Sequence, residues 1–129
     1  MSEEYQKTIL SHATQLMVSD IHRAVDFYTE KLGFSVMQIH GEPPSFAIAE
    51  LGAVSIMLKQ SAEGPRPTAA SLSGMWDAYI WVRDIKAVEN FLREKSVTLH
   101  RGPEVAPHGC TEIEVKDPDG HIIAFGYCP

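Results

Sequence analysis

One acidic and two aromatic residues alternate along an apolar stretch in the second half of the chain. Asp77, Tyr79 and Trp81 occupy every second position, so in a β-strand they share one face. Aromatic rings beside a carboxylate suit a flat or cationic organic ligand, through stacking and cation–π attraction. A carboxyl group in an apolar pocket could also act as a general base, because burial raises its pKa. The plainer alternatives are that both rings fill a core or a dimer seam and that Asp77 is salt-bridged or solvated.

The histidines and cysteines lack the spacing of a known metal or nucleophile site. No two histidines stand four residues apart, as on a zinc-binding helix, and we expect His12 and His121 to be structural or surface residues. His108 could lower the pKa of the Cys110 thiol if their loop brought them together, although such pairs usually have no function. Two cysteines are too few for a disulfide framework, so we expect Cys110 and Cys128 to be reduced.

The elements that position these residues come from a segment that occurs twice. A shift of 64 positions places residues 16–31 on residues 80–95 with six identities in sixteen positions. Each copy predicts a strand, an aspartate that caps the next helix (Asp20 or Asp84), and an amphipathic helix. Two copies are too few for a solenoid. They predict two halves that close on each other.

Both halves predict the same order of elements. The first has a helix whose apolar stripe is Ile21, Val25, Tyr28 and Leu32, with Gly33 as a left-handed cap; its strands are expected at 12–18 and near 34–39, 45–51 and 53–59. The second has a helix at 85–95 with a weaker cap at Ser96, and strands at 76–82 and near 97–101, 111–116 and 121–127. Residues 117–120, Asp-Pro-Asp-Gly, fit a type I turn. The loop at 101–109 is expected to border a cavity and could act as a lid.

This pattern predicts an α+β fold of two βαβββ modules within a single domain. The modules are expected at about 8–60 and 75–128, joined by a Pro- and Gly-rich linker at about 61–74. The chain of 129 residues with 44% hydrophobic composition is long enough to bury one core. Its net charge of -6, with no basic cluster, argues against nucleic acid as a partner. Since no apolar run reaches membrane-span length and the N-terminus lacks signal-peptide features, we expect no membrane contact and a cytoplasmic location.

The paired βαβββ units, the stretch DIHRAVDFYTEKLGF at 20–34 and the terminal DPDGHIIAFG at 117–126 resemble the vicinal oxygen chelate superfamily. That superfamily includes glyoxalase I, bleomycin-resistance proteins, fosfomycin-resistance enzymes and extradiol dioxygenases. The resemblance covers about residues 8–128. It implies a mixed sheet in each half, with the two sheets forming a cupped cavity and the helices packed on the outer face, usually within a homodimer.

Members of this superfamily that perform metal chemistry take ligands from four strand positions. The surrounding motifs place these positions at Ala13, Ile56, Asp77 and Ala124, or at Met57 instead of Ile56 if the alignment slips by one. Three of them offer no oxygen or nitrogen donor, so we expect neither a metal nor another cofactor. A divalent metal held by an atypical ligand set drawn from His12, Asp77 and His121 is the alternative.

The side chains that line the cavity then decide the function. Strand alternation together with the resemblance predicts a ligand-binding set of Gln15, Met17, Ile56, Tyr79, Trp81 and Ile122. Our first hypothesis is a protein that binds a small aromatic or cationic organic molecule without chemistry, as bleomycin-resistance proteins do. The alternatives are a metal-dependent lyase or isomerase resembling glyoxalase I, a related dioxygenase, and metal-free catalysis with Asp77 as the base.

Overall fold

The computed structural model describes residues 2–64, 72 and 74–129. Most of the expected linker, residues 65–71 and 73, lies outside the described residues. From β1 onward the elements follow the predicted order. They are α1 (Glu3–Thr8), β1 (Ala13–Val18), α2 (Ile21–Asp26), the π-helical turn η1 (Phe27–Lys31), β2 (Ser35–His40), β3 (Phe46–Leu51), β4 (Val54–Gln60), β5 (Ala78–Trp81), α3 (Ile85–Glu94), β6 (Leu99–Val105), β7 (Thr111–Lys116) and β8 (Ile122–Tyr127).

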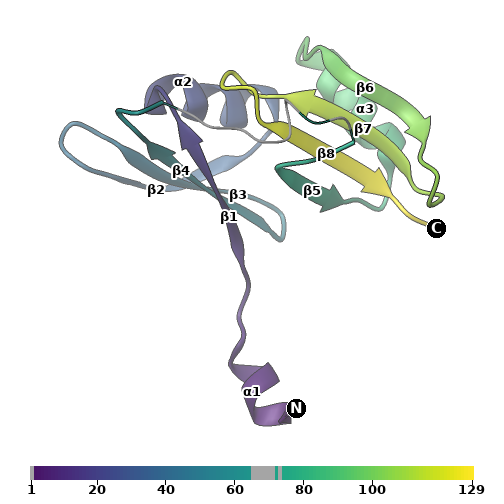
Figure 1. The fold of residues 1–129 in the computed structure, drawn as a ribbon, viewed down its shortest axis with the longest axis horizontal. Coiled ribbons are helices and arrows are strands. Elements are labelled where there is room, and N and C mark those ends of the chain that lie inside the picture. Colours follow the sequence, from purple (N-terminus) through teal and green to yellow (C-terminus); the bar gives the residue numbers. More distant parts are fainter. Residues whose placement is uncertain (1, 65–71, 73) are drawn as a thin grey trace.

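The strands form two four-stranded sheets with equivalent topology. Their orders are β1-β4-β3-β2 and β5-β8-β7-β6. The first strand of each half runs parallel to the last strand of that half, and the other pairs are antiparallel. Figure 1 shows the two sheets as separate units, with the second half toward the upper right. The predicted α+β architecture of two βαβββ modules is therefore confirmed.

The caps of the two long helices match the sequence prediction. The carboxylate of Asp20 accepts hydrogen bonds from the backbone N–H groups of His22 and Arg23, and Asp84 caps α3 in the same way. Gly33 follows the helix formed by α2 and η1 and has a φ of 84°. Ser96 takes the equivalent position with a φ of 59°, a conformation that costs a non-glycine residue free energy.

The helix-bearing faces of both sheets share one hydrophobic core. From α2 to the C-cap of η1, Ile21, Tyr28 and Leu32 are buried as predicted. Ala24 is also fully buried, whereas Val25 is only partly buried. The buried cluster contains residues of both halves: Leu16, Val18, Ile21, Ala24, Tyr28, Leu32, Phe34, Ala47, Ala49, Ile56, Leu58, Ile80, Leu92, Ile113, Val115, Ile123 and Phe125. The opposite face of each sheet is left for other contacts.

The Asp-Pro-Asp-Gly turn forms as predicted and also joins the two halves. The N–H of Gly120 donates to the carbonyl of Asp117 at 3.0 Å. The buried hydroxyl of Tyr28 donates to Asp117 Oδ2 at 2.8 Å, and the hydroxyl of Ser19 donates to Asp119 Oδ1 at 2.6 Å. These bonds connect η1 and the residue after β1 to the turn of the β7–β8 hairpin.

Two segments differ from the sequence prediction. The edge strand β6 continues to Val105, so the expected loop at 101–109 is reduced to residues 106–110. Residues 3–8, where no helix was expected, form helix α1, which projects from the body in Figure 1, and every residue from Ser2 to His12 is exposed. In the described ranges, no helix combines the length and apolar character needed to cross a membrane.

Candidate functional site

The concave face of the second sheet carries a row of polar and aromatic side chains. Strand register places Tyr79 beside Ala124, Ala124 beside Glu114, and Glu114 beside Arg101. The neighbouring row runs Trp81, Gly126, Glu112 and Glu104 in the same manner. Ile80, Ile123 and Phe125 face the core instead. The predicted alternation on β5 and β8 is therefore confirmed.

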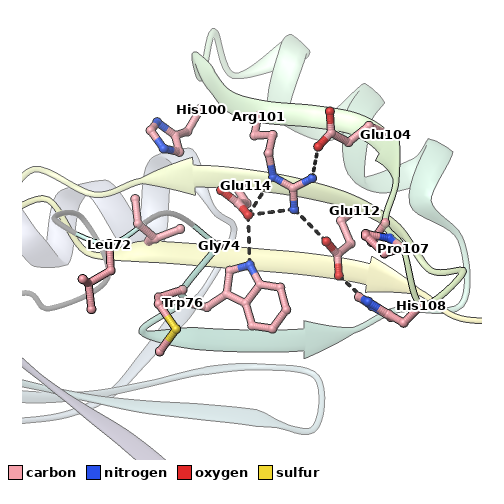
Figure 2. Close-up of a pocket in the computed structure, with 13 residues that line it drawn as sticks. Leu72, Gly74, Trp76, His100, Arg101, Glu104, Pro107, His108, Glu112 and Glu114 are labelled. Atoms are coloured by element: carbon pink, nitrogen blue, oxygen red, sulfur yellow. Dashed lines mark hydrogen bonds and ion pairs between the residues drawn. The ribbon is translucent and has the colours of Figure 1, made fainter.

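A cavity of about 640 Å³ lies over this face. Figure 2 shows its walls, made by β6, β7 and the segment that leads into β5. The described lining residues are Leu72, Gly74, Met75, Trp76, His100, Arg101, Glu104, Ala106, Pro107, His108, Glu112, Glu114 and Ile122. All of them come from the second half or the segment before it. The cavity of a single chain therefore differs from the one implied by the resemblance, which would use both halves.

Arg101 is surrounded by three carboxylates. Its Nη2 lies 2.6 Å from Glu112 Oε1 and 2.7 Å from Glu114 Oε2, its Nε donates to Glu114 Oε2 at 2.8 Å, and its Nη1 contacts Glu104. Figure 2 shows the guanidinium at the centre of this group. The hydrogen bond to Glu114 contributes most to raising the pKa of Arg101 above its ordinary value. The guanidinium thus stays charged and fixed in one plane.

Glu112 links the arginine to the aromatic wall. The hydroxyl of Tyr79 donates to Glu112 Oε2 at 2.8 Å, and His108 Nε2 lies 3.1 Å from the same oxygen. Burial raises the pKa of Glu112, but hydrogen bonds from Arg101 and Tyr79 outweigh burial and leave that pKa below its ordinary value. Burial and the bond to this carboxylate raise the pKa of Tyr79 to about 12. Glu112 is therefore an anion and Tyr79 a neutral donor near neutral pH.

Three aromatic rings form a continuous wall beside these charges. The ring centroids of Trp76 and Tyr79 are 4.7 Å apart, and those of Tyr79 and Trp81 are 5.6 Å apart. The indole Nε1 of Trp76 donates to Glu114 Oε2 at 2.9 Å, as Figure 2 shows. Rings held edge to face leave flat surfaces on which another ring can stack.

The predicted ligand-binding residues of the second half have different positions relative to the cavity. Ile122 lines the cavity. Tyr79 does not line it but contacts two residues that do, Glu112 and Trp76. Trp81 lies at the end of the aromatic wall with 76% of its surface exposed, outside the lining. Asp77 accepts a hydrogen bond from the backbone N–H of Ile122 at 2.8 Å, which closes the β5–β8 ladder.

The predicted residues of the first half do not reach this cavity. Gln15 and Met17 are exposed on the face of the first sheet that lies away from the core. Ile56 was expected on that face too, but it is 2% exposed and packs in the core, because it pairs with Thr14 in the register that places Met57 beside Gln15. The facing of Ile56 was therefore predicted wrongly.

The equivalent row of the first sheet carries no charge. It runs Gln15, Met57, Ile48 and Gln38 by strand register, in the place of Tyr79, Ala124, Glu114 and Arg101 of the second sheet. The two halves thus share a backbone topology and differ in the chemistry of the concave face.

Sequence reasoning missed the residues that make the cavity polar. The alternation Glu112-Ile113-Glu114-Val115 was available as a signal, because it places both carboxylates on one face. Arg101 was assigned to the end of a strand and the start of a loop. Trp76 was counted as the start of a strand and given no role, whereas β5 begins at Ala78 and the indole of Trp76 donates a hydrogen bond to Glu114.

The four family positions for metal ligands do not supply a donor set. Ala13 and Ala124 have no donor atom, Ile56 is in the core, and the carboxylate of Asp77 is engaged by the Ile122 N–H. His121, of the alternative ligand set, is buried with its Nδ1 2.9 Å from Asp117 Oδ2. Among the residues that the structure describes, no three His, Cys, Asp or Glu side chains gather as a metal would require. The residues present do not fit a bound cation of this kind.

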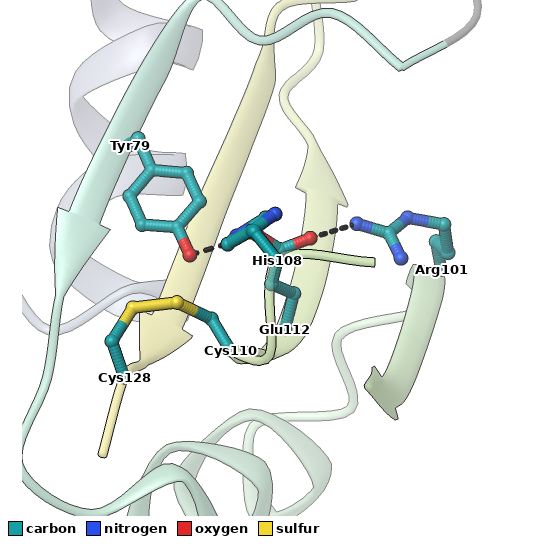
Figure 3. The surroundings of a disulfide bond; sticks show 6 residues. All are labelled: Tyr79, Arg101, His108, Cys110, Glu112 and Cys128. Carbon is teal, nitrogen blue, oxygen red and sulfur yellow. Dashed lines mark hydrogen bonds and ion pairs between the residues drawn. A yellow bond between two sulfur atoms is a disulfide. The ribbon is translucent and has the colours of Figure 1, made fainter. Parts of the chain in front are cut away.

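Cys110 and Cys128 form a disulfide, so the prediction that both are reduced was wrong. Their Cα atoms lie 4.3 Å apart at the open end of the β7–β8 hairpin, one position beyond the pair Thr111 and Tyr127. Figure 3 shows the disulfide close to Tyr79, His108 and Glu112. A hairpin centred on the predicted turn at 117–120 would have placed Cys110 opposite Tyr127. The observed register, which pairs Lys116 with Ile122, is longer by one residue on the β8 side and brings Cys110 opposite Cys128.

Solved structures with this fold include a binding protein and an enzyme. TnmS3, described as an antibiotic binding protein from Streptomyces sp. CB03234, is 25% identical with a TM-score of 0.68, and the match covers 93% of this chain and 98% of that one. A glyoxalase/bleomycin resistance protein/dioxygenase superfamily member from Sphaerobacter thermophilus DSM 20745 is 25% identical with a TM-score of 0.70, over 92% and 97% of the two chains. A lactoylglutathione lyase from Agrobacterium tumefaciens, at 16% identity, a TM-score of 0.69 and 93% coverage of both chains, shares the fold.

The family comparison covers most of the chain. The model of the Glyoxalase/Bleomycin resistance protein/Dioxygenase superfamily matches residues 9–125. This range includes the first sheet, both long helices, the second sheet up to Phe125 of β8, and the described residues that line the cavity. The chain therefore belongs to the Glyoxalase/Bleomycin resistance protein/Dioxygenase superfamily.

Proposed function

We propose that this protein binds a small aromatic or cationic organic molecule in the cavity of its second half and holds it without converting it. The observation that carries the proposal is that Trp76 and the buried carboxylates of Glu112 and Glu114 line one cavity of about 640 Å³, with Tyr79 and Trp81 continuing the row of rings beside it. A cavity of this size holds a drug-sized molecule. The likeness to TnmS3, an antibiotic binding protein, supports a role in sequestering such a molecule.

Binding by this site is attributed to stacking and to electrostatic attraction. Trp76 is held by its bond to Glu114, and Tyr79 by its bond to Glu112. Rings that are fixed before the ligand arrives lose little conformational freedom on binding. A flat guest would lie against these rings with its polar groups directed toward the carboxylates.

Tryptophan fluorescence tests this proposal, because the chain has two tryptophans. In Trp81→Phe, which keeps a ring at the end of the wall, emission comes from Trp76 alone. Titration with a panel of planar aromatic compounds, neutral and cationic, is expected to quench this emission saturably. Trp76→Ala is expected to weaken binding of the same compound by roughly tenfold, measured by calorimetry. A broad panel without any saturable quenching would contradict the proposal.

The enzymatic alternatives have less support from the residues present. A glyoxalase-type lyase or isomerase, or a dioxygenase, needs a Lewis acid at the family position, where the donor set does not fit. Metal-free catalysis would use Asp77, whose Oδ2 is occupied by the Ile122 N–H. Elemental analysis of purified protein separates the first alternative from binding alone. A pH–rate profile that Asp77→Asn alters would support the second.

We also propose a homodimer, as the family resemblance implies. Exposed apolar side chains on the first half and on the N-terminal arm support it: Tyr5, Ile9, Leu10, Met17, Met37 and Ile39. Such side chains gain free energy when a second copy covers them. Light scattering during size-exclusion chromatography is expected to give twice the mass of the chain, and a mass of one chain at micromolar concentration would contradict the proposal.

The cytoplasm remains our proposed location, and the disulfide offers a test of it. Cytoplasmic thiols are normally kept reduced. If the protein is cytoplasmic, the disulfide of the structure is open in the cell, and alkylation in intact cells before lysis modifies Cys110 and Cys128. Full protection of both thiols would instead indicate an oxidising compartment.

A further inference from the structure

The cavity holds more negative than positive charge. Glu104, Glu112 and Glu114 face one guanidinium, that of Arg101. Glu112 is 1% exposed and Glu114 is 5% exposed. A buried carboxylate is costly unless cations and hydrogen-bond donors compensate its charge. One arginine shared between two buried carboxylates leaves the rest of this compensation to hydrogen-bond donors.

The two buried carboxylates differ in how their oxygens are used. Glu112 uses both, since Oε1 pairs with Arg101 while Oε2 accepts from Tyr79 and lies beside His108. Glu114 receives Trp76 Nε1, Arg101 Nε and Arg101 Nη2, and all three reach Oε2. Within the part of the chain that the structure describes, Oε1 of Glu114 receives no hydrogen bond.

The unused oxygen belongs to the cavity. The Glu114 side chain is 7% exposed and lines the cavity, and no buried side-chain oxygen among the described residues lacks a partner while sealed from solvent. The remaining surface of Glu114 therefore opens to the cavity. Trp76 and Arg101 hold the carboxylate in place from the Oε2 side, so Oε1 is a fixed, negatively charged acceptor next to an aromatic ring.

We propose that Glu114 Oε1 accepts an N–H group from a cationic guest, so that the ligands of this site are aromatic cations carrying N–H donors, such as protonated amines or amidines. This inference rests on the proposed function and names the chemical class of its ligand. The guest's ring stacks on Trp76 while its charged nitrogen meets Glu114. An anionic guest would be repelled by the three carboxylates, and a neutral ring would leave Oε1 without a donor.

Three acridines of similar shape test the inference on the unaltered protein. At mildly alkaline pH acridine is neutral, 10-methylacridinium is a cation without an N–H group, and 9-aminoacridine is a cation with N–H groups. Calorimetric titration is expected to rank their affinities in that order, with 9-aminoacridine bound roughly 10- to 100-fold more tightly than acridine, as expected for a charge-assisted hydrogen bond.

Glu114→Gln identifies the group responsible. It keeps the shape and an acceptor for Trp76 and Arg101 but removes the charge, so it is expected to weaken 9-aminoacridine roughly 10- to 100-fold and acridine far less. The matched control is Glu50→Gln, which removes the same charge from β3 of the first sheet, outside the cavity. It is expected to leave all three affinities unchanged.

The outcomes separate this inference from the proposed function. If acridine binds saturably and 9-aminoacridine binds no more tightly, the ligand class assigned here is wrong while the binding function stands. Equal affinities for 10-methylacridinium and 9-aminoacridine would overturn the N–H contact with Glu114. If none of the three binds, the proposed function fails together with the inference. The comparison of probes on the unaltered protein holds even if Glu114→Gln fails to fold.

Discussion

At the scale of single residues, the aromatic wall depends on the absence of a side chain at position 126. A Cβ atom there would overlap the hydroxyl and ring of Tyr79. Gly126→Ala is therefore expected to displace Tyr79 from Glu112 and to destabilise the protein by about 1–3 kcal/mol. Urea unfolding measures the loss, and ligand titration is expected to show weaker binding.

A double-mutant cycle provides the control for this prediction. In a Tyr79→Ala background the overlapping atoms are gone, so Gly126→Ala is expected to cost less than about 0.5 kcal/mol. An equal cost in both backgrounds would show that position 126 matters for a reason other than Tyr79.

A buried ion pair makes the stability of the protein depend on pH. Burial alone would lower the pKa of His121, but the hydrogen bond and charge of Asp117 outweigh burial and raise it. Burial likewise raises the pKa of Asp117, and the bonds from His121 and Tyr28 outweigh it and lower that pKa. The imidazolium–carboxylate pair is thus fully formed between about pH 4 and 6.5, the ordinary pKa values of the two groups.

The sign of the pH dependence follows from these directions. The stabilisation from His121 is complete below about pH 6.5 and is lost as the pH rises through its raised pKa, while that from Asp117 is lost as the pH falls through its lowered pKa. Urea unfolding of the unaltered protein is expected to show both losses. His121→Gln is expected to cost about 3–5 kcal/mol near pH 6 and to remove the loss at higher pH. His22→Gln, at an exposed position, is the control, and an unchanged pH profile in His121→Gln would refute the assignment.

Residue patterns predicted part of the candidate site. Tyr79, Ala124 and Ile122 could be placed on the concave face, because the alternation of β5 and β8 is regular. Trp76 could not, since it precedes the strand and its orientation depends on Glu114, a partner 38 residues away. The alternation of residues along one strand gives no information about contacts with residues far away in the sequence.

At the scale of elements, the left-handed residue that ends each duplicated helix can be tested. Gly33 and Ser96 both adopt a left-handed conformation, which favours glycine. Ser96→Gly is expected to stabilise the protein by about 1 kcal/mol and to raise its melting temperature by roughly 3–5 °C. Circular dichroism measures the melting temperature. Ser96→Ala keeps the unfavourable Cβ and is expected to give no increase.

The β7–β8 hairpin is closed by a covalent bond, which sets a second expectation at this scale. The disulfide joins residues 18 positions apart, and a loop of this length corresponds to roughly 3 kcal/mol of stabilisation. Dithiothreitol is expected to lower the free energy of unfolding by about this amount. The double variant Cys110→Ser, Cys128→Ser should start at the lower value and not respond. If thiol titration of the native protein, without reductant, finds two reactive thiols, the disulfide is absent and this expectation is wrong.

The sequence predicted the elements better than their ends. The repeat identified both helices and the order of strands, because caps and apolar stripes are local signals. Strand β6 was ended too early, at Gly102 and Pro103, which usually interrupt a sheet. It continues to Val105 because it is an edge strand, where a proline needs no partner on its outer side.

At the scale of the whole molecule, the architecture followed from the repeat and the location of the cavity did not. Duplicated βαβββ units predicted two mixed sheets whose helices cover one face. The location of a cavity depends on how the two halves pack against each other. Long-range contacts such as the hydrogen bond from Tyr28 to Asp117 determine this packing. A cavity between the halves was expected, whereas the described residues that line the observed cavity come from the second half and the segment before it.

The unequal rows of the two sheets set the stoichiometry of binding. The neutral row of the first half, from Gln15 to Gln38, offers neither the rings nor the carboxylates of the second. An internal duplication that had kept both sites would bind two molecules per chain. Calorimetry is expected to give one, and a second equivalent event would mean that both copies retain the capacity of a common ancestor.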